Sequence, residues 1–542
     1  MATYHSFDLV DGNEDPSLLT TSVRQEFRQA TNLPSSQPLP PADQAQNLFE
    51  GNETEQGDVI SDHHDDLKGR IVTETKKLWK IVGPAIIYRT SNYSMNAVTQ
   101  AFAGHLGVTQ LASMCIAESV IVAFNFGFLL GMATALETLC GQAYGARKYN
   151  KLGIYLQRSW IVLSFSSILL LPIYVFATPV LNLLGQQHEV AELAGVLSLW
   201  FIPMHLAIPF TCSMQKFLMS QLKVNIVAFI SVSTLLFHIF ISWLLVYKFE
   251  FGVIGAAVAL DISWWIAFFG MFVYVVFGGW CPLTWNGFSM EAFSGLGEFL
   301  KLSSASGVML CLEFWYYRVL IIMTGNLKNA TIAVGALSVC MSINGWELMI
   351  PFAFLAATGV RVANELGAGN AKGAKFAAKV SLVQSTVLGV IFCAIILIFN
   401  VKLAHIFSSS LEIIMAVHKL SYLLAFTILL NSVQPILSGV AIGSGWQSLV
   451  ACTNLGCYYI IGVPLGVVMG MALDLGVKGI WCAMIIGGTA VQTGILAVIT
   501  IRRDWDKEAR QALSRHDKPI IKTEQQPLPE TSTAERKPQI QG

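Results

Sequence analysis

VSLVQSTVLGVIFCAIILIFN, at residues 380–400, contains no charged side chain. An α-helix needs about 20 mostly apolar residues to cross the hydrocarbon core of a bilayer. The stretch is therefore long enough to span a membrane. It is expected to do so as a helix, because a lone strand in lipid would leave its backbone groups unpaired.

Eleven further runs have the same character, which predicts an all-α integral membrane protein with twelve transmembrane helices. They lie at 78–103, 111–138, 155–178, 194–213, 224–247, 252–278, 298–324, 331–357, 418–441, 449–471 and 477–501.

The composition agrees with this fold class. The 542 residues are 54% hydrophobic and only 13% charged, whereas soluble domains carry about 25% charged residues. Between residues 71 and 501 there are 35 charged side chains in 431 residues. So few charges exclude a soluble enzyme or a nucleic-acid binder, and the net charge of zero gives no reason to expect a polyanionic partner. The expected surroundings are a lipid bilayer, and we expect a monomer.

Lys and Arg residues in the loops predict the orientation. One set of loops carries 11 of them and the opposite set 5. The residues just before the first run and just after the last join the larger set, so both termini are expected in the cytosol. Residues 1–75 are expected to form an acidic, disordered tail. Residues 502–542 are expected to form a second tail, which is rich in Lys, Glu, Pro and Gln and disordered from 510 onward.

An internal repeat relates two halves at an offset of 224 residues. Ala133-Thr134 matches Ala357-Thr358, and FGVIGAAVA at 251–259 matches LGVKGIWCA at 475–483. Six helices separate the copies, so the halves run parallel. We expect lobes at 76–280 and 281–501, an arrangement typical of secondary transporters, which place the substrate between the halves. A duplication that serves stability alone is the alternative.

Glu313 is the strongest candidate for a functional residue, because ionisable groups inside a span are costly and mark ion or substrate pathways. It lies midway along its run, and Tyr316 and Tyr317 follow at helical spacing on the same face. Such a carboxyl group can load and release a proton as a cavity opens to either side. The alternative is a permanent pair with an Arg; Arg318, at i+5, does not share the face of Glu313.

A second candidate site is Asn431-Ser-Val-Gln434-Pro435. Proline frees the carbonyl group four residues earlier, so position 431 offers both an amide side chain and a main-chain acceptor, and Gln434 lies one turn away. A simple packing kink is the alternative. Pro351 stands in the same relation to Glu347, and Trp346 beside it is a candidate for lining a cavity.

The other ionisable residues inside the runs are weaker candidates. Asp261 is interpreted as a helix-packing hydrogen bonder, while Glu118 either faces a cavity or pairs with Arg89. His205 and His238 are interpreted as core histidines. No nucleotide-binding G-x-x-x-x-G-K-[ST], H-E-x-x-H or G-x-S-x-G motif occurs. ATP as a direct energy source, a metal site and an enzyme activity are therefore not expected.

Four segments make the chain similar to the plant branch of the multidrug and toxic compound extrusion (MATE) family: GMATALETLCGQAYGARKY (131–149), VMLCLEFWYY (308–317), VRVANELGAGN (360–370) and ILSGVAIGSGWQ (436–447). The resemblance implies a V-shaped bundle of two six-helix lobes. It also implies efflux of organic solutes such as flavonoids or xenobiotics by alternating access, in exchange for H⁺ and without a cofactor.

The resemblance also assigns residues. The family's coupling acid in the seventh helix maps onto Glu313, and its partner acid in the tenth helix maps onto Asn431, which is not acidic. An acid in the first helix of some relatives maps near Thr99. The Asn-x-x-Gln-Pro-x-Leu-Ser-Gly sequence resembles a subgroup associated with vacuolar flavonoid transport, which favours the vacuolar over the plasma membrane. Some relatives are vacuolar chloride pathways, so an anion conductance is the alternative function.

Overall fold

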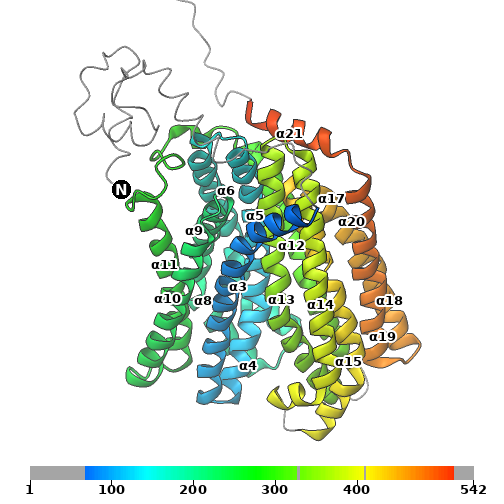
Figure 1. Cartoon of the computed structure of the whole chain (residues 1–542). Coiled ribbons are helices and arrows are strands. Elements are labelled where there is room, and N and C mark those ends of the chain that lie inside the picture. The colour runs from blue at the N-terminus through cyan, green and yellow to red at the C-terminus, as the bar shows by residue number, and fades with distance from the viewer. Residues whose placement is uncertain (1–66, 326–329, 408–409, 518–542) are drawn as a thin grey trace, which may run out of the picture. The chain divides into compact units, whose positions relative to one another are not determined.

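The computed structural model describes residues 67–325, 330–407 and 410–517. All described regular elements are helices, and each of the twelve predicted runs falls in one helix or in consecutive helices (Figure 1). The first half contains α3 (Leu67–Leu106), α4 (Val108–Ile116), η2 (Ala117–Val122), α5 (Ala123–Gly145), α6 (Asn150–Val175), α7 (Ala177–Leu183), α8 (His188–Trp200), α9 (Ile202–Ser220), α10 (Val224–Trp243), η3 (Leu244–Lys248) and α11 (Gly252–Val276).

The second half follows a short turn, η4 (Met290–Phe293). It contains α12 (Leu296–Gly325), α13 (Ala330–Gly367), α14 (Ala371–Phe407), α15 (Leu411–Asn431), α16 (Gln434–Ser444), α17 (Gln447–Asn454), η5 (Leu455–Gly462), α18 (Val463–Val467), η6 (Val468–Ala472), α19 (Gly476–Ala483), η7 (Met484–Ala490), α20 (Val491–Arg502) and α21 (Trp505–Asp517).

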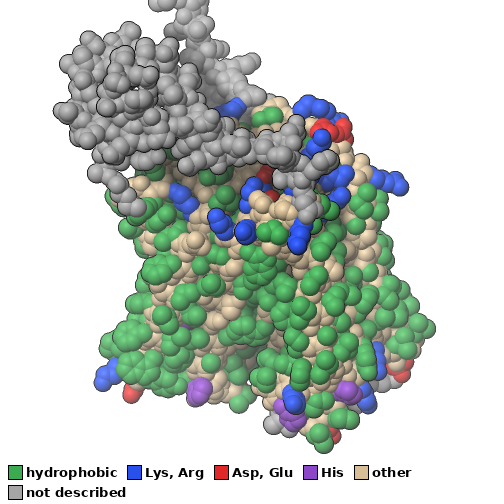
Figure 2. Space-filling view, viewed as in Figure 1, with side chains coloured by type: hydrophobic (Ala, Val, Ile, Leu, Met, Phe, Trp, Pro, Cys, Tyr) green, Lys and Arg blue, Asp and Glu red, His purple; other side chains and the backbone are tan. Residues whose placement is uncertain are grey.

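Within the described ranges nine helices are long and apolar enough to cross a membrane, and the bent pair α8–α9 makes a tenth. The remaining two predicted spans, α3 and α12, are also long helices, and they contain Arg89 and Arg318. Only 17% of the most apolar part of α14 is buried inside the protein. Apolar side chains cover much of the surface over the spans (Figure 2). An apolar surface of this kind is favourable in contact with lipid and unfavourable in contact with water.

The bend between α8 and α9 is 49°. Helix α9 begins with free backbone N–H groups, as every helix does, and the N–H of Met204 donates to Asp261 Oδ1 at 3.1 Å. Trp265 Nε1 donates to the carbonyl of Pro203 beside it. Asp261 is thus the helix-packing hydrogen bonder that its sequence context predicts.

The C-terminal segment differs from expectation. Residues 505–517 form a helix, α21, and its Trp505, Ala509 and Ala512 are buried. Trp446 Nε1 donates to Glu508 at 3.0 Å. The prediction of disorder from residue 510 was therefore wrong as far as 517, because apolar side chains spaced three to four residues apart pack this helix on the bundle. The predicted N-terminal tail, 1–75, was also wrong at its end, because residues 67–75 belong to α3 and Glu74 is buried there. Residues 1–66 and 518–542 lie outside the described residues.

We call the end of the bundle that carries Arg147, Lys148, Arg502, Arg503 and α21 the basic end. Figure 2 shows Lys and Arg side chains gathered there. Helices α5, α13 and α16 meet at this end with their backbones in close contact, because glycines line the crossings. A side chain at Gly145 would overlap the carbonyl oxygen of Asn364, and one at Gly367 would overlap that of Gln142.

Candidate functional site

Glu313 lies on α12 and is 6% exposed. Gln434 at the start of α16 is within hydrogen-bonding reach of its carboxyl group, and its Oε2 has no hydrogen-bond partner among the described residues. Gln434 Nε2 donates to Ser438 Oγ at 3.1 Å. Tyr317 and Tyr458 are within electrostatic range of the carboxyl group. No ion pair among the described residues includes Glu313, so a permanent pair with an Arg is not observed there.

A chain of hydrogen bonds begins at Tyr317, close to this carboxyl group, and joins three helices. The Tyr317 hydroxyl donates to Asn431 Oδ1 at 3.1 Å. Asn431 Nδ2 in turn donates to Asn344 Oδ1 on α13 at 3.0 Å. Glu347, one turn further along α13, is within electrostatic range of Tyr317 and has a buried Oε2 without a partner. Glu313, Tyr317, Asn431, Gln434 and Glu347 therefore lie in one polar cluster, which we call the acidic cluster.

The remaining two predicted site residues lie elsewhere. The Tyr316 hydroxyl donates to the carbonyl of Met484 at 2.6 Å, and its ring stacks on Tyr458 with centroids 4.3 Å apart. Tyr316 is thus engaged in helix packing and does not share the orientation of Tyr317. Trp346 is 41% exposed, and it contacts Tyr93 of α3 edge-on at 4.9 Å. It contacts the first half of the chain through Tyr93.

The break between α15 and α16 positions the amides of the acidic cluster. Helix α15 ends at Asn431 and α16 begins at Gln434, with Pro435 in its first turn. Ser385 Oγ donates to the carbonyl of Ser432 at 2.7 Å. Irregular backbone at membrane depth requires such partners. The interruption predicted from the proline is therefore present and brings Asn431 and Gln434 to α12 and α13.

Three other ionisable residues of the spans lie in the first half. Gln100 Nε2 donates to Glu118 Oε2 at 2.6 Å, so Glu118 pairs with an amide and not with Arg89. His205 contacts the carbonyl of Ser167 at 2.9 Å, and His238 contacts Thr99 and Ser263 at 3.1 and 3.0 Å. Both histidines are the core residues that were predicted. Within the described ranges no group of three or more His, Cys, Asp or Glu side chains is arranged to hold a metal ion.

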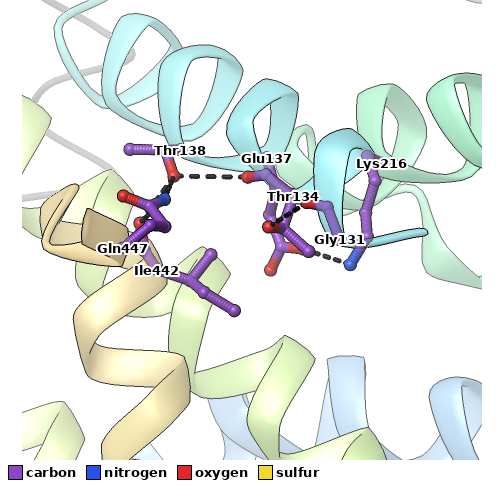
Figure 3. A network of polar contacts seen from close by, with 7 residues as sticks. All are labelled: Gly131, Thr134, Glu137, Thr138, Lys216, Ile442 and Gln447. Atoms are coloured by element: carbon purple, nitrogen blue, oxygen red, sulfur yellow. Dashed lines mark hydrogen bonds and ion pairs between the residues drawn. The ribbon is translucent and has the colours of Figure 1, made fainter. Parts of the chain in front are cut away.

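A second polar network closes the basic end (Figure 3). Thr138 on α5 donates to the carbonyl of Ile442 on α16 at 2.6 Å, and Gln447 Nε2 donates to Thr138 Oγ1 at 2.8 Å. Next to them, the buried Lys216 on α9 pairs with Glu137 on α5. Sequence reasoning missed this network. Glu137 is an acid inside an apolar run, which is the signal that marked Glu313, and the same rule would have selected it.

The C-terminal helix adds to this closure. Arg515 Nη1 donates to Gln142 Oε1 on α5 at 3.2 Å and to the carbonyl of Ser444 on α16 at 3.4 Å. Burial lowers the pKa of Arg515, and the nearby Glu508 carboxylate opposes that shift. A pocket of about 420 Å³ lies beside it, lined partly by Arg502, Arg503 and Lys507. None of the predicted site residues lines that pocket.

Comparisons with known proteins assign the family. The MatE family model matches residues 84–244 and 305–468, two stretches whose starts and ends are 221 and 224 residues apart, in agreement with the repeat. The chain is 61% identical to Protein DETOXIFICATION 27 of Arabidopsis thaliana over 452 residues, which cover 83% of this chain and 93% of that protein. It is 56% identical to Protein DETOXIFICATION 28 of the same plant over 460 residues, 85% of this chain and 94% of that one.

Solved structures agree on the fold. The crystal structure of the eukaryotic MATE transporter AtDTX14 aligns with a TM-score of 0.79 at 35% identity, covering 82% of this chain and 99% of that one. An outward-facing multidrug resistance MATE transporter aligns with a TM-score of 0.67 at 18% identity, over 82% and 97% of the two chains. The chain therefore belongs to the MatE family, as an all-helical, multi-pass efflux transporter of the plant DETOXIFICATION type and not an enzyme.

Proposed function

We propose that this chain exports organic solutes in exchange for protons, and that Glu313 carries the proton. The observation that supports this role is a buried carboxyl group with one unpartnered oxygen and no ion pair among the described residues. An acid paired permanently with a cation would stay ionised, whereas Glu313 is free to change its protonation state.

The neighbours of Glu313 suit both protonation states. The side chain of Gln434, which is within hydrogen-bonding reach of it, has an NH₂ donor for the carboxylate and an oxygen acceptor for the protonated acid. Asn431 stands where the family's second acid is implied, and its amide is already engaged by Tyr317 and Asn344. In our proposal Glu347 supplies a second carboxyl group to the acidic cluster in its place.

Solute movement requires the two halves to separate at the basic end. The contacts there are direct hydrogen bonds between α5 and α16, such as Thr138 to Ile442, together with glycine crossings between α5 and α13. Alternating access would break this set as the opposite end closes. We propose that the basic end faces the cytosol, as the distribution of Lys and Arg predicts, that the membrane is the vacuolar one, and that flavonoids are among the solutes.

Uptake into proteoliposomes under an imposed pH gradient tests the proton role, with quercetin as the solute. Glu313→Gln should reduce gradient-driven uptake to the level of empty vesicles, because an amide cannot exchange a proton. Quercetin exchange without a gradient should persist. Glu118→Gln is the matched control, since Glu118 is another buried acid within a span but pairs with Gln100. Undiminished uptake by Glu313→Gln would remove Glu313 from the mechanism.

An anion conductance is the second candidate function. It is favoured by Asn431, a neutral residue where a coupled exchanger of this family is expected to have an acid. Patch-clamp recording of the host membrane distinguishes the two functions. Large currents carried by chloride in the absence of organic solute would favour the conductance, and their absence would favour the exchanger.

A further inference from the structure

Two arginines lie inside the spans without a counter-ion among the described residues. Arg318 on α12 is exposed and, among the described residues, has neither an ion pair nor a hydrogen bond. Arg89 on α3 also has no ion pair in the described part of the chain, and its Nε is buried without a partner. A cation at membrane depth is costly, and in known proteins it pairs with another group or with a ligand.

Tyr93 shows where the Arg318 guanidinium lies. Its ring contacts Trp346 of α13 edge-on, with an interplanar angle of 77°, and its hydroxyl would lie 2.8 Å from a Cβ atom at Gly345. The same side chain is within electrostatic range of Arg318. Tyr93 belongs to α3, one helical turn beyond Arg89. Tyr93 of α3 contacts α13 and is close to Arg318 of α12, which puts Arg318 near the junction between the two halves of the chain.

Aromatic rings from four helices surround this junction. Trp315, one turn before Arg318, contacts Phe124 of α5 edge-on at 5.4 Å. The guanidinium of Arg89 lies 5.7 Å from the ring centroid of Phe352 on α13. Together with Tyr93 and Trp346, these rings provide flat apolar walls beside positive charge. Such walls bind planar organic molecules well, because offset and edge-on ring contacts add to apolar burial.

The acids of the cluster do not neutralise Arg318. Glu313 lies within hydrogen-bonding reach of Gln434 of the second half, and Glu347 is within electrostatic range of Tyr317. Tyr93 is the titratable side chain that acts on Arg318, and no described acid does. Helix α12 therefore presents its acid toward the interior of the second half and its arginine toward the first half. No described acid serves as the counter-ion of Arg318, which makes a bound anion the candidate for that role.

We propose that Arg318 and Arg89, with Tyr93, Trp346 and Trp315, form a binding site for aromatic organic anions. The carboxylate or phenolate of the ligand pairs with the Arg318 guanidinium, whose planar donors match two carboxylate oxygens. The ring of the ligand packs on the tryptophans. This inference rests on the proposed transport of organic solutes. It specifies that the preferred solutes are negatively charged and not organic cations.

Equilibrium binding to the purified full-length protein tests the site without any ion gradient. Fluorescein and rhodamine 123 share a xanthene ring system and carry opposite charges, so they separate the effect of charge from that of shape. Fluorescence anisotropy should show tighter binding of fluorescein, and Arg318→Gln should weaken it about tenfold or more. Arg318→Lys should weaken it less, and Arg89→Gln should weaken it measurably. Lys301→Gln is the matched control, because it removes an exposed charge from the same helix and should change nothing.

Three outcomes would overturn the proposal: unchanged fluorescein affinity in a folded Arg318→Gln protein, tighter binding of rhodamine 123 by the wild type, or displacement of fluorescein by chloride as readily as by benzoate. If Arg318→Gln does not fold, Arg318→Lys is measured instead, provided that its unfolding temperature is unchanged. An unaltered fluorescein affinity in both Arg318→Lys and Arg89→Gln would also contradict the site. Loss of gradient-driven uptake in Glu313→Gln together with an unaltered fluorescein affinity in Arg318→Gln would reject this site while the proton exchange stands. Undiminished uptake in Glu313→Gln together with weakened fluorescein binding in Arg318→Gln would reject the proton exchange and support the binding site.

Discussion

Arg361 on α13 forms a two-point ion pair with Glu74 on α3, with Nε to Oε1 at 2.9 Å and Nη2 to Oε2 at 3.0 Å. Both side chains are largely buried, and Arg361 also contacts Glu365 at 2.5 Å. The pair joins the first and second halves of the chain 287 residues apart. It lies at the basic end, with the glycine crossings and the Thr138 network.

Removing the Glu74 carboxylate should weaken that closure. Glu74→Gln leaves a buried guanidinium with one acid partner, so we expect a loss of about 1–3 kcal/mol in the free energy of unfolding. Thermal unfolding of the purified protein measures it. Glu192→Gln is the control, because the His188–Glu192 pair is exposed and such pairs contribute about 0–1 kcal/mol. Equal effects of the two substitutions would contradict a special role for Glu74.

The glycine crossing between α5 and α13 should not tolerate a methyl group. Gly145→Ala would force the Asn364 carbonyl away, and overpacking of this kind costs about 1–3 kcal/mol or more. At Gly494, on α20, no described atom lies within 4 Å of a built Cβ. Gly494→Ala should therefore stabilise the protein slightly, by up to about 1 kcal/mol. If the unfolding temperature changed in the same direction in both variants, the close contact between α5 and α13 at Gly145 would not be what excludes a methyl group there.

The buried pair of Lys216 and Glu137 should behave as a unit. Lys216→Met leaves an unpaired buried carboxylate, which costs about 3–5 kcal/mol. The double variant Lys216→Met with Glu137→Leu removes both charges and should recover much of the loss. Denaturation of the three proteins under the same conditions measures the interaction. A single variant as stable as the wild type would show that the pair is dispensable.

Restoring an acid in the tenth span should alter the pH dependence of transport. Asn431→Asp replaces an amide that donates to Asn344 Oδ1. The new group can keep that bond only when protonated, so its ionisation should change uptake across a pH series. Asn400→Asp is the control, because Asn400 contacts His418 away from the acidic cluster. If the wild type and Asn431→Asp had the same pH profile of uptake, residue 431 would have a structural role only and no part in proton coupling.

Helix α21 should restrain opening at the basic end. Arg515→Gln removes the donor that joins Gln142 to Ser444, so the buried Ser444 should become accessible more often. The accessibility of position 444 is measured by labelling the Ser444→Cys variant with an impermeant maleimide and subtracting the labelling of the native cysteines. Labelling should become several-fold faster. Arg510→Gln, an exposed position of the same helix, is the control; equal rates in both would exclude the restraint.

The sequence alone predicted the all-helical, multi-span fold, since crossing a bilayer depends on local apolar length. Of the twelve predicted spans, ten are long and apolar enough in the described ranges when the bent pair α8–α9 is counted as one. It also indicated Glu313, Asn431 and Gln434 as candidates. An ionisable residue or a proline inside an apolar span is energetically costly, and it can be recognised from the sequence without knowing its neighbours in the fold. The same reasoning grouped Tyr316 with Tyr317, although one hydroxyl bonds to Met484 and the other to Asn431.

Only the tertiary structure decided which distant residues meet. Glu74 pairs with Arg361, Tyr93 lies against Trp346, and Arg515 reaches Gln142 across 373 residues. None of these contacts has a local signature, because each depends on how helices from the two halves pack. A side chain turns by about 100° per residue along a helix, so the neighbours of Trp346 and Glu347 differ although the residues are adjacent. The direction that each side chain faces is therefore set by packing and not by the order of residues.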